Sequence, residues 1–242
     1  MVTSCTNCPL RKLPCFDDFT EEELEFMIRF KVGEITVDAG TQILTEGTSS
    51  PQLMTALRGL GLRYKTLRDG RRQVVNFIFP GDFLGLQAGL MGEVRHSVEA
   101  STRMTLCVFN RSDLWSLFRG QPERAFDLTW LAAVEERFLG EALTSVGQHS
   151  AIERICWAII RLYKRGEALG MLTDGAMPLP YRQQDLADAL GLSLVHTNKT
   201  LAKLRERQLV SWQDGMLRVD DPEGLARIAD LTLADRKVRP LI

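Results

Sequence analysis

The sequence has few of the features that mark membrane proteins and common enzymes. No apolar run approaches the roughly 18 residues of a membrane helix, and the polar N-terminus lacks the apolar core of a signal peptide. Only three histidines are present, none with a metal-ligand partner at helical spacing. No Ser-His-Asp set, pair of catalytic carboxylates or phosphate-binding loop is visible. We therefore expect a cytoplasmic protein that makes no membrane contact and is not an enzyme.

Cysteine is also scarce, but its distribution is uneven. Five cysteines occur in 242 residues, and Cys5, Cys8 and Cys15 all lie in a short polar arm where core packing does not explain them. In a reducing compartment, an odd cysteine count indicates ligands or core residues and not disulfides. Clustered thiolates are what soft metals and iron–sulfur clusters require. Zinc also takes four thiolates, so zinc, a plain thiol redox site and no metal stay open as alternatives.

The near-zero net charge of −1 gives no sign of a nucleic-acid partner, but the charge distribution does. Residues 1–147 carry 16 Lys/Arg and 19 Asp/Glu, whereas residues 148–242 carry 14 and 12. The C-terminal part is therefore net positive, which fits DNA binding there. A chain of this length can hold two domains, each with its own core.

Local patterns predict an α+β protein. Residues 16–31 form an amphipathic pattern, with Thr20 as the cap and Glu23 completing a capping box. Residues 33–111 hold short alternating runs separated by turn signals, and Asp69-Gly70 predicts a hairpin between two of them. Many short strands at this spacing predict a small antiparallel β-barrel or sandwich.

A long helix is expected next, with Pro122 in its first turn and Gly147 as a hinge after its end near Val146. Small and apolar residues recur on one face at three- and four-residue steps, which fits a seam with a second helix. A single buried helix without a partner is the alternative. The expected seam residues are Ala125, Ala132, Leu139, Leu143 and Val146, together with Glu136 about one turn before Leu139.

Residues 182–205 predict two helices joined by a tight turn, after a helix over 150–168. Gly191 lets the chain reverse, Ser193 caps the second helix, and a hairpin at Asp214-Gly215 would form a wing. Such a second helix lays its first turns in the major groove, where Asn pairs with adenine and Lys reaches guanine or phosphate. A helical hairpin with a solvated polar face is the alternative. The candidate DNA-binding residues are Arg182, Ser193, Val195, His196, Asn198, Lys199, Lys203, Arg205 and Arg218.

The whole chain resembles the cyclic-AMP receptor protein/fumarate-nitrate reduction regulator (CRP/FNR) superfamily of bacterial transcription factors. The resemblance rests on Gly40, Gly47, Gly59, the run Pro80-Gly81-Asp82-Phe83, the long helix and the helix-turn-helix. It implies a jelly-roll sensor of the cyclic-nucleotide-binding type, a dimerisation helix and a C-terminal winged helix-turn-helix. It also implies a homodimer on pseudo-palindromic double-stranded DNA, with RNA polymerase as a partner if the protein is an activator. The expected ranges are 1–20 for the arm, 21–118 for the sensor, 119–147 for the dimerisation helix, 148–230 for the DNA-binding domain and 231–242 for a tail.

The cysteines resemble those of the fumarate-nitrate reduction branch, which has three near the N-terminus and a fourth in the barrel. The resemblance implies a [4Fe-4S] cluster and a response to oxygen or nitric oxide. The implied ligands are Cys5, Cys8, Cys15 and Cys107. The remaining cysteine, Cys156, lies on an apolar helix face and is expected to pack in a core.

Two departures narrow what the resemblance implies. Leu86 stands where the cyclic-AMP branch has an acidic ribose-binding residue, so we do not expect cyclic AMP to bind in the usual mode. On the second helix, Val195, Asn198 and Lys199 stand where the other branch has the Glu, Ser and Arg that read its half-site. The base preference is therefore expected to differ in part.

Overall fold

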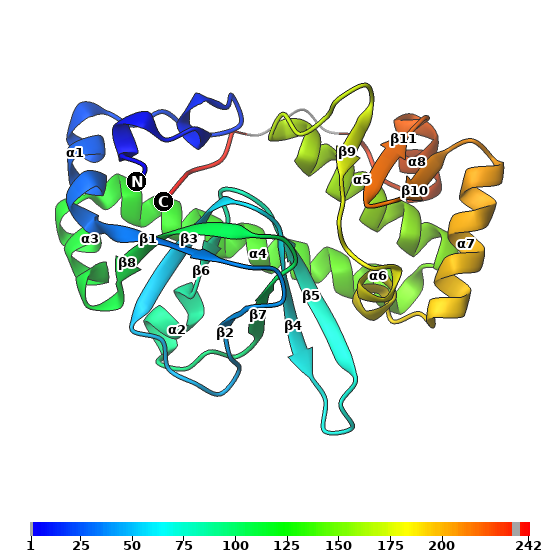
Figure 1. Cartoon of the computed structure of the whole chain (residues 1–242), viewed down its shortest axis with the longest axis horizontal. Coiled ribbons are helices and arrows are strands. Elements are labelled where there is room, and N and C mark those ends of the chain that lie inside the picture. The colour runs from blue at the N-terminus through cyan, green and yellow to red at the C-terminus, as the bar shows by residue number, and fades with distance from the viewer. Residues whose placement is uncertain (1, 234–237) are drawn as a thin grey trace. The chain divides into compact units, whose positions relative to one another are not determined.

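The computed structural model describes residues 2–233 and 238–242 and divides into two compact units (Figure 1). Of the described residues, the N-terminal unit comprises 2–65, 75–136 and 238–242. The C-terminal unit comprises residues 66–74 and 137–233. In the described part of the chain, no helix combines the length and apolar character needed to cross a membrane.

Two four-stranded antiparallel sheets build the N-terminal unit, as the alternating runs predict. The two sheets do not close into a barrel, and their arrangement is consistent with the expected jelly-roll. Apolar side chains such as Met54, Val98 and Leu106 fill the core with at most 3% of their surface exposed. The first sheet has the order β1 (Lys31–Val37), β8 (Met104–Asn110), β3 (Gln52–Arg58), β6 (Phe83–Leu84), and the second β2 (Gln42–Leu44), β7 (Ser97–Ala100), β4 (Gly61–Thr66), β5 (Arg72–Ile78).

Short helices surround these sheets. Thr20 accepts from the Glu23 amide and the Glu23 carboxylate accepts from the Thr20 amide, so the expected capping box is confirmed. The helix is shorter than the expected 16–31, because Phe16 forms a β-bridge and Lys31 begins β1. The helical elements are η1 (Cys5–Asn7), η2 (Leu10–Lys12), α1 (Glu21–Phe30), α2 (Leu86–Met91), η3 (Arg111–Asp113) and α3 (Leu114–Gly120).

The long helix α4 spans Pro122–Gln148 and begins with Pro122 as expected. It continues through Gly147, and the break falls at the two residues between α4 and the next helix, α5 (Ala151–Ala168). Ser150 and Glu153 form a capping box there, which starts a new helix instead of extending the old one. The expected hinge therefore lies slightly later in the sequence.

The C-terminal unit has a three-stranded sheet and a set of helices packed on α5. Ile155, Cys156 and Ile159 of α5 are fully buried, so Cys156 packs in a core as expected. Asp214-Gly215 turns between two paired strands, which confirms the wing. The sequence did not predict the third strand, β9 (Ala176–Pro178). The other elements are α6 (Gln183–Leu190), α7 (Leu194–Glu206), β10 (Val210–Gln213), β11 (Met216–Val219) and α8 (Pro222–Ile228).

The expected tail, residues 231–242, lies partly outside the described residues, which omit 234–237. Its last five residues, Val238–Ile242, belong to the N-terminal unit and run beside the N-terminal arm (red and blue in Figure 1). Leu241 and Ile242 are each only 4% exposed. The end of the described chain is therefore built into the core of the unit in which the chain begins.

Candidate DNA-reading helix and cysteine site

The turn between α6 and α7 sets the direction of α7. Gly191 has a positive φ of 64°, a conformation that side chains with a Cβ rarely adopt, and its amide donates to the Ala187 carbonyl to close α6. Ser193 then accepts from the His196 amide and caps α7. Leu201 and Leu204 hold α7 on the core of the unit.

The outward face of α7 is polar and open. Thr197 and Thr200 face inward and are buried, whereas Val195 is 63% exposed. Five of the predicted residues lie on one exposed face of α7, namely Val195, His196, Asn198, Lys199 and Lys203. The other four lie elsewhere: Ser193 at the cap of α7, Arg205 in its last turn, Arg182 before α6 and Arg218 on the wing. All nine are exposed: Arg182, Ser193, Val195, His196, Asn198, Lys199, Lys203, Arg205 and Arg218.

A buried carboxylate, which the sequence analysis did not identify, fixes the start of α6. Asp185 is 3% exposed, and its Oδ1 accepts from Arg72 at 2.7 Å and from Arg182 at 2.9 Å. Its Oδ2 accepts from the Arg182 amide at 2.9 Å and so satisfies a free helix N–H group. The short distance in sequence from Arg182 to Asp185 indicates the capping contact, but nothing local indicates Arg72, which is 113 residues away.

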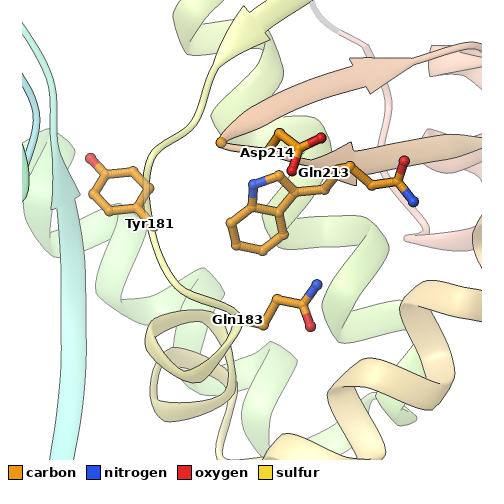
Figure 2. A pocket seen from close by; sticks show the side chains of 6 residues that line it. Tyr181, Gln183, Gln213 and Asp214 are labelled. Atoms are coloured by element: carbon orange, nitrogen blue, oxygen red, sulfur yellow. The ribbon is translucent and has the colours of Figure 1, made fainter.

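An open hollow of about 540 Å³ lies where the start of α6 meets the wing, lined by Tyr181, Gln183, Gln213 and Asp214 among others (Figure 2). Its charged lining residue is acidic, so the hollow does not suit a phosphate group. A smaller hollow of about 100 Å³ shares Gln183 with it and is also lined by residues of α7. The surface of α7 next to the wing is therefore concave, with both polar and apolar side chains in its lining.

The N-terminal arm docks on a buried ion pair. Lys31 donates to the Glu34 carboxylate at 2.7 Å and to the Thr3 carbonyl at 2.6 Å, and the Thr3 amide donates back to Glu34 at 3.1 Å. The side chains of Lys31 and Glu34 are 7% and 10% exposed. On β8, Cys107 lies in register with Glu34 of the neighbouring strand. The Cys5 thiol lies 3.7 Å from the Met27 carbonyl oxygen.

The thiols of Cys5 and Cys107 lie in the electrostatic field of this ion pair. Burial raises the pKa of Cys107 to about 11, although the nearby Lys31 ammonium acts in the opposite direction. Burial likewise raises the pKa of Cys5, and Lys31 again opposes the shift. The charge of Cys8 acts on both of these thiols. Cys5 and Cys107 therefore both lie near the Lys31–Glu34 ion pair, and Cys8 lies near these two thiols.

The fourth cysteine of the expected ligand set has a different environment. Cys15 is 4% exposed, and its carbonyl accepts from the amide of Arg239 in the last described segment. Among residues 2–233 and 238–242, no three or more His, Cys, Asp or Glu side chains are grouped so as to hold a metal ion. The thiols have the right chemistry for a [4Fe-4S] cluster, but their placement does not fit one.

A polar network ties α4 to the second sheet of the N-terminal unit. Glu135 accepts from Arg63 of β4 at 3.0 Å and from Asn76 of β5 at 3.1 Å. Arg63 also donates to the Phe83 carbonyl at 2.9 Å. His96 is half-buried near this network, and its burial together with the positive charge of Arg63 lowers its pKa to about 4. Glu135 therefore faces the sheets, while Glu136 is exposed on another side of α4.

The expected seam residues do not all share one environment. Ala132, Glu136, Leu139 and Leu143 are exposed, with Leu139 at 45% and Leu143 at 75%. Ala125 is 8% exposed and packs in the core around Phe30 and Phe109. Val146 is half-buried, close to Gly191. Phe126, which sequence reasoning did not single out, is 64% exposed at the N-terminal part of α4.

Comparison with known families matches both units. A model of the Crp-like helix-turn-helix domain matches residues 153–228, and a model of the cyclic nucleotide-binding domain matches residues 34–121. The nitrogen fixation regulation protein FixK of Rhizobium meliloti is 31% identical over 81% of this chain and 86% of its own length. The chain belongs to the CRP/FNR superfamily.

Other relatives place it in the FNR-like branch of that superfamily. FixK of Bradyrhizobium diazoefficiens is 28% identical over 93% of each chain, and the transcriptional activator FnrL of Cereibacter sphaeroides is 25% identical over 86% of this chain and 84% of its own. The structure of FixK2 from Bradyrhizobium japonicum superposes with a TM-score of 0.74, covering 84% of this chain and 98% of that one at 24% identity.

Membership in the CRP/FNR superfamily confirms the expected family and fold. The relatives are transcriptional regulators and not enzymes, and this chain is a DNA-binding transcriptional regulator of the same kind. The four-cysteine ligand set, the base-reading residues and the seam stay predictions.

Proposed function

We propose that this regulator binds a pseudo-palindromic DNA site as a homodimer, with one α7 in the major groove of each half-site. The observation that carries this proposal is the exposed row Val195, Asn198 and Lys199 on a capped helix whose opposite face is buried. Asn198 pairs with adenine and Lys199 reaches a guanine acceptor or a phosphate. Val195 makes an apolar contact with a thymine methyl group.

Residues around α7 supply affinity and not base preference. Lys203, Arg205 and Arg218 carry exposed positive charges beside the reading face and are assigned to phosphates. Arg182 is 66% exposed although it pairs with Asp185, so its outer edge also reaches the backbone of DNA. Each phosphate contact releases counterions, which makes binding depend steeply on salt.

Salt titration of DNA binding tests these roles. Lys203→Ala should weaken binding to every DNA sequence and reduce the slope of log K against log salt by about one. Arg227→Ala is the matched control, because Arg227 is an exposed arginine on α8 and belongs neither to α7 nor to the wing. An unchanged slope for Lys203→Ala would remove that residue from the interface.

The dimer is assigned to the exposed face of α4. Leu139 and Leu143 are large apolar side chains exposed on the same face of one helix, and Ala132 on that face leaves room for close approach. Burial of such side chains against a second copy is the main driving force for association. RNA polymerase stays the expected further partner if the regulator is an activator.

We also infer that the cysteine arm is the element that responds to a signal. The arm docks on the Lys31–Glu34 ion pair, and the thiols of Cys5 and Cys107 lie near the same pair, so chemistry at these thiols changes how the arm docks. The predicted signal is oxygen or nitric oxide with a [4Fe-4S] cluster. Because the described placement does not form a cluster cage, zinc or thiol redox chemistry stands beside it as the second candidate.

Purification under nitrogen separates these candidates. A brown protein with iron and sulfide in equal amounts, bleached by air and colourless in Cys8→Ser, would establish the cluster and require the arm to rearrange on loading. A colourless protein would reject the cluster, and zinc analysis with thiol titration would then separate zinc from thiol redox chemistry. DNA binding that is identical in air and under nitrogen, in parent and Cys8→Ser, would reject the arm as a sensor.

A further inference from the structure

The segment Val238–Ile242 returns to the N-terminal unit and docks against the residue that carries the third cysteine of the arm. The Arg239 amide donates to the Cys15 carbonyl at 2.9 Å, and the Asp17 amide donates to the Arg239 carbonyl at 3.0 Å. These two bonds enclose Phe16 in a parallel β-bridge with Arg239. The backbone around Cys15 and the last segment therefore hold each other in place.

Side chains reinforce this pairing. Both terminal nitrogens of Arg239 lie 3.3 Å from Oδ1 of Asp82, which is 8% exposed and accepts from the Phe79 amide with its other oxygen. The Arg239 guanidinium also lies over the Phe16 ring, 5.8 Å from its centre. The Phe16 ring in turn lies so close to Gly81 that a Cβ there would be 2.2 Å from it. Arg239 thus fits between the arm and the Pro-Gly-Asp turn.

The apolar end of the segment reaches the core below the cysteines. Ile242 is buried among Phe30, Phe83 and Phe109, and half-buried Cys107 packs against the same cluster. The buried Thr55 hydroxyl donates to the Ile242 carbonyl. The segment therefore contacts the surroundings of both a cysteine of the arm and the cysteine of the sheet.

We propose that Val238–Ile242 is a latch, and that docking of the latch and docking of the arm at Cys15 are one equilibrium. The latch follows the C-terminal unit in the chain and belongs to the N-terminal unit, so it is one of the places at which the chain connects the two units. Displacement of the arm therefore releases the latch. Because the two equilibria are linked, release of the latch also exposes Cys15, and the coupling is equal in both directions. Any effect of the latch on DNA binding rests on the proposed function, whereas the linkage between the latch and the arm does not.

Alkylation of individual cysteines in the native reduced chain tests this linkage. Arg239→Ala removes a charge-assisted contact, so iodoacetamide should modify Cys15 about tenfold faster than in the parent, as read by peptide mass spectrometry. Arg227→Ala, which removes an exposed arginine from α8, should leave the rate unchanged. Fully buried Cys156 is the internal control for global unfolding and should stay protected in every variant. Equal Cys15 rates in parent and Arg239→Ala, with Cys156 protected, would overturn the proposal.

Amide hydrogen exchange of the unmodified chain gives a test that does not depend on a variant's folding. The amides of Asp17 and Arg239 lie on opposite partners of the bridge, so a single opening event gives them the same protection factor within about twofold. Neither measurement depends on DNA or on the occupancy of the cysteines. An Asp17 amide protected at least tenfold more than the Arg239 amide would show that the segment opens alone, which contradicts the latch.

Discussion

Replacing Asp185 by alanine should destabilise the C-terminal unit far more than replacing its neighbour Asp188. The Asp185 carboxylate is 4% exposed and lies 2.7 Å from an Arg72 nitrogen, and the Arg72 side chain is itself 21% exposed. Breaking a buried pair leaves the partner's charge uncompensated and costs about 3–5 kcal/mol when burial is complete. The partial exposure of Arg72 lowers this to about 2 kcal/mol.

The lost helix cap adds about 1 kcal/mol, because Asp185 also accepts from the Arg182 amide. The bridge to the Arg182 side chain, 66% exposed, contributes little. The expected total for Asp185→Ala is therefore about 3 kcal/mol. Asp188 lies 3.8 Å from Arg72 and caps no helix, so Asp188→Ala should cost less than about 1 kcal/mol.

Urea unfolding monitored by circular dichroism measures both values, with Arg72→Ala and the double variant completing a cycle. The account predicts a coupling energy between Arg72 and Asp185 of about 1–2 kcal/mol. Additive effects of Arg72→Ala and Asp185→Ala, or equal destabilisation by Asp185→Ala and Asp188→Ala, would refute the reasoning from burial and geometry.

Burial and Arg63 lower the pKa of His96 to about 4, so the contribution of His96 to stability is present above about pH 6.5 and is lost as pH falls toward 4. His96→Gln should therefore flatten the pH dependence of the unfolding free energy between these pH values. His196→Gln, at an exposed position, should not. Leu143→Asp should abolish the dimer in sedimentation experiments while Gln148→Asp preserves it, and a dimeric Leu143→Asp would move the interface off this face. With its pKa raised to about 11 by burial, Cys107 should react with iodoacetamide at pH 7.5 more than about a hundredfold slower than free cysteine, and a rate near that of free cysteine would contradict its described environment.

The local signals of the C-terminal unit made its elements predictable from sequence. The turn at Gly191, the cap at Ser193 and the hairpin at Asp214-Gly215 each depend on neighbouring residues, and the structure places all three as expected. The capping box at Thr20 followed for the same reason. The start of α1 was misjudged because the residues before Thr20 have a helical pattern but Phe16 is used in a bridge to a distant segment.

Contacts between residues far apart in sequence were beyond prediction. Nothing local distinguishes Glu135 from Glu136, and only the positions of Arg63 and Asn76 decide that Glu135 faces the sheets. The five residues from Val238 have no strong pattern, so their docking beside Cys15 could not be foreseen. The clustering of three cysteines in a short polar arm is visible in the sequence, but the placement of Cys5 and Cys107 near Lys31 and of Cys15 beside Arg239 depends on the tertiary fold.

Selection of bound DNA from a random library by the purified chain tests whether α7 is the reading helix of a dimer. We expect an enriched pseudo-palindrome with half-sites about one helical turn apart, and Asn198→Ala should lose the preference for one base in each half-site while keeping the rest. An enriched sequence without two-fold symmetry, or a motif unchanged by Asn198→Ala and by changes at Val195 and Lys199, would contradict the assignment of α7 as the reading helix of a dimer.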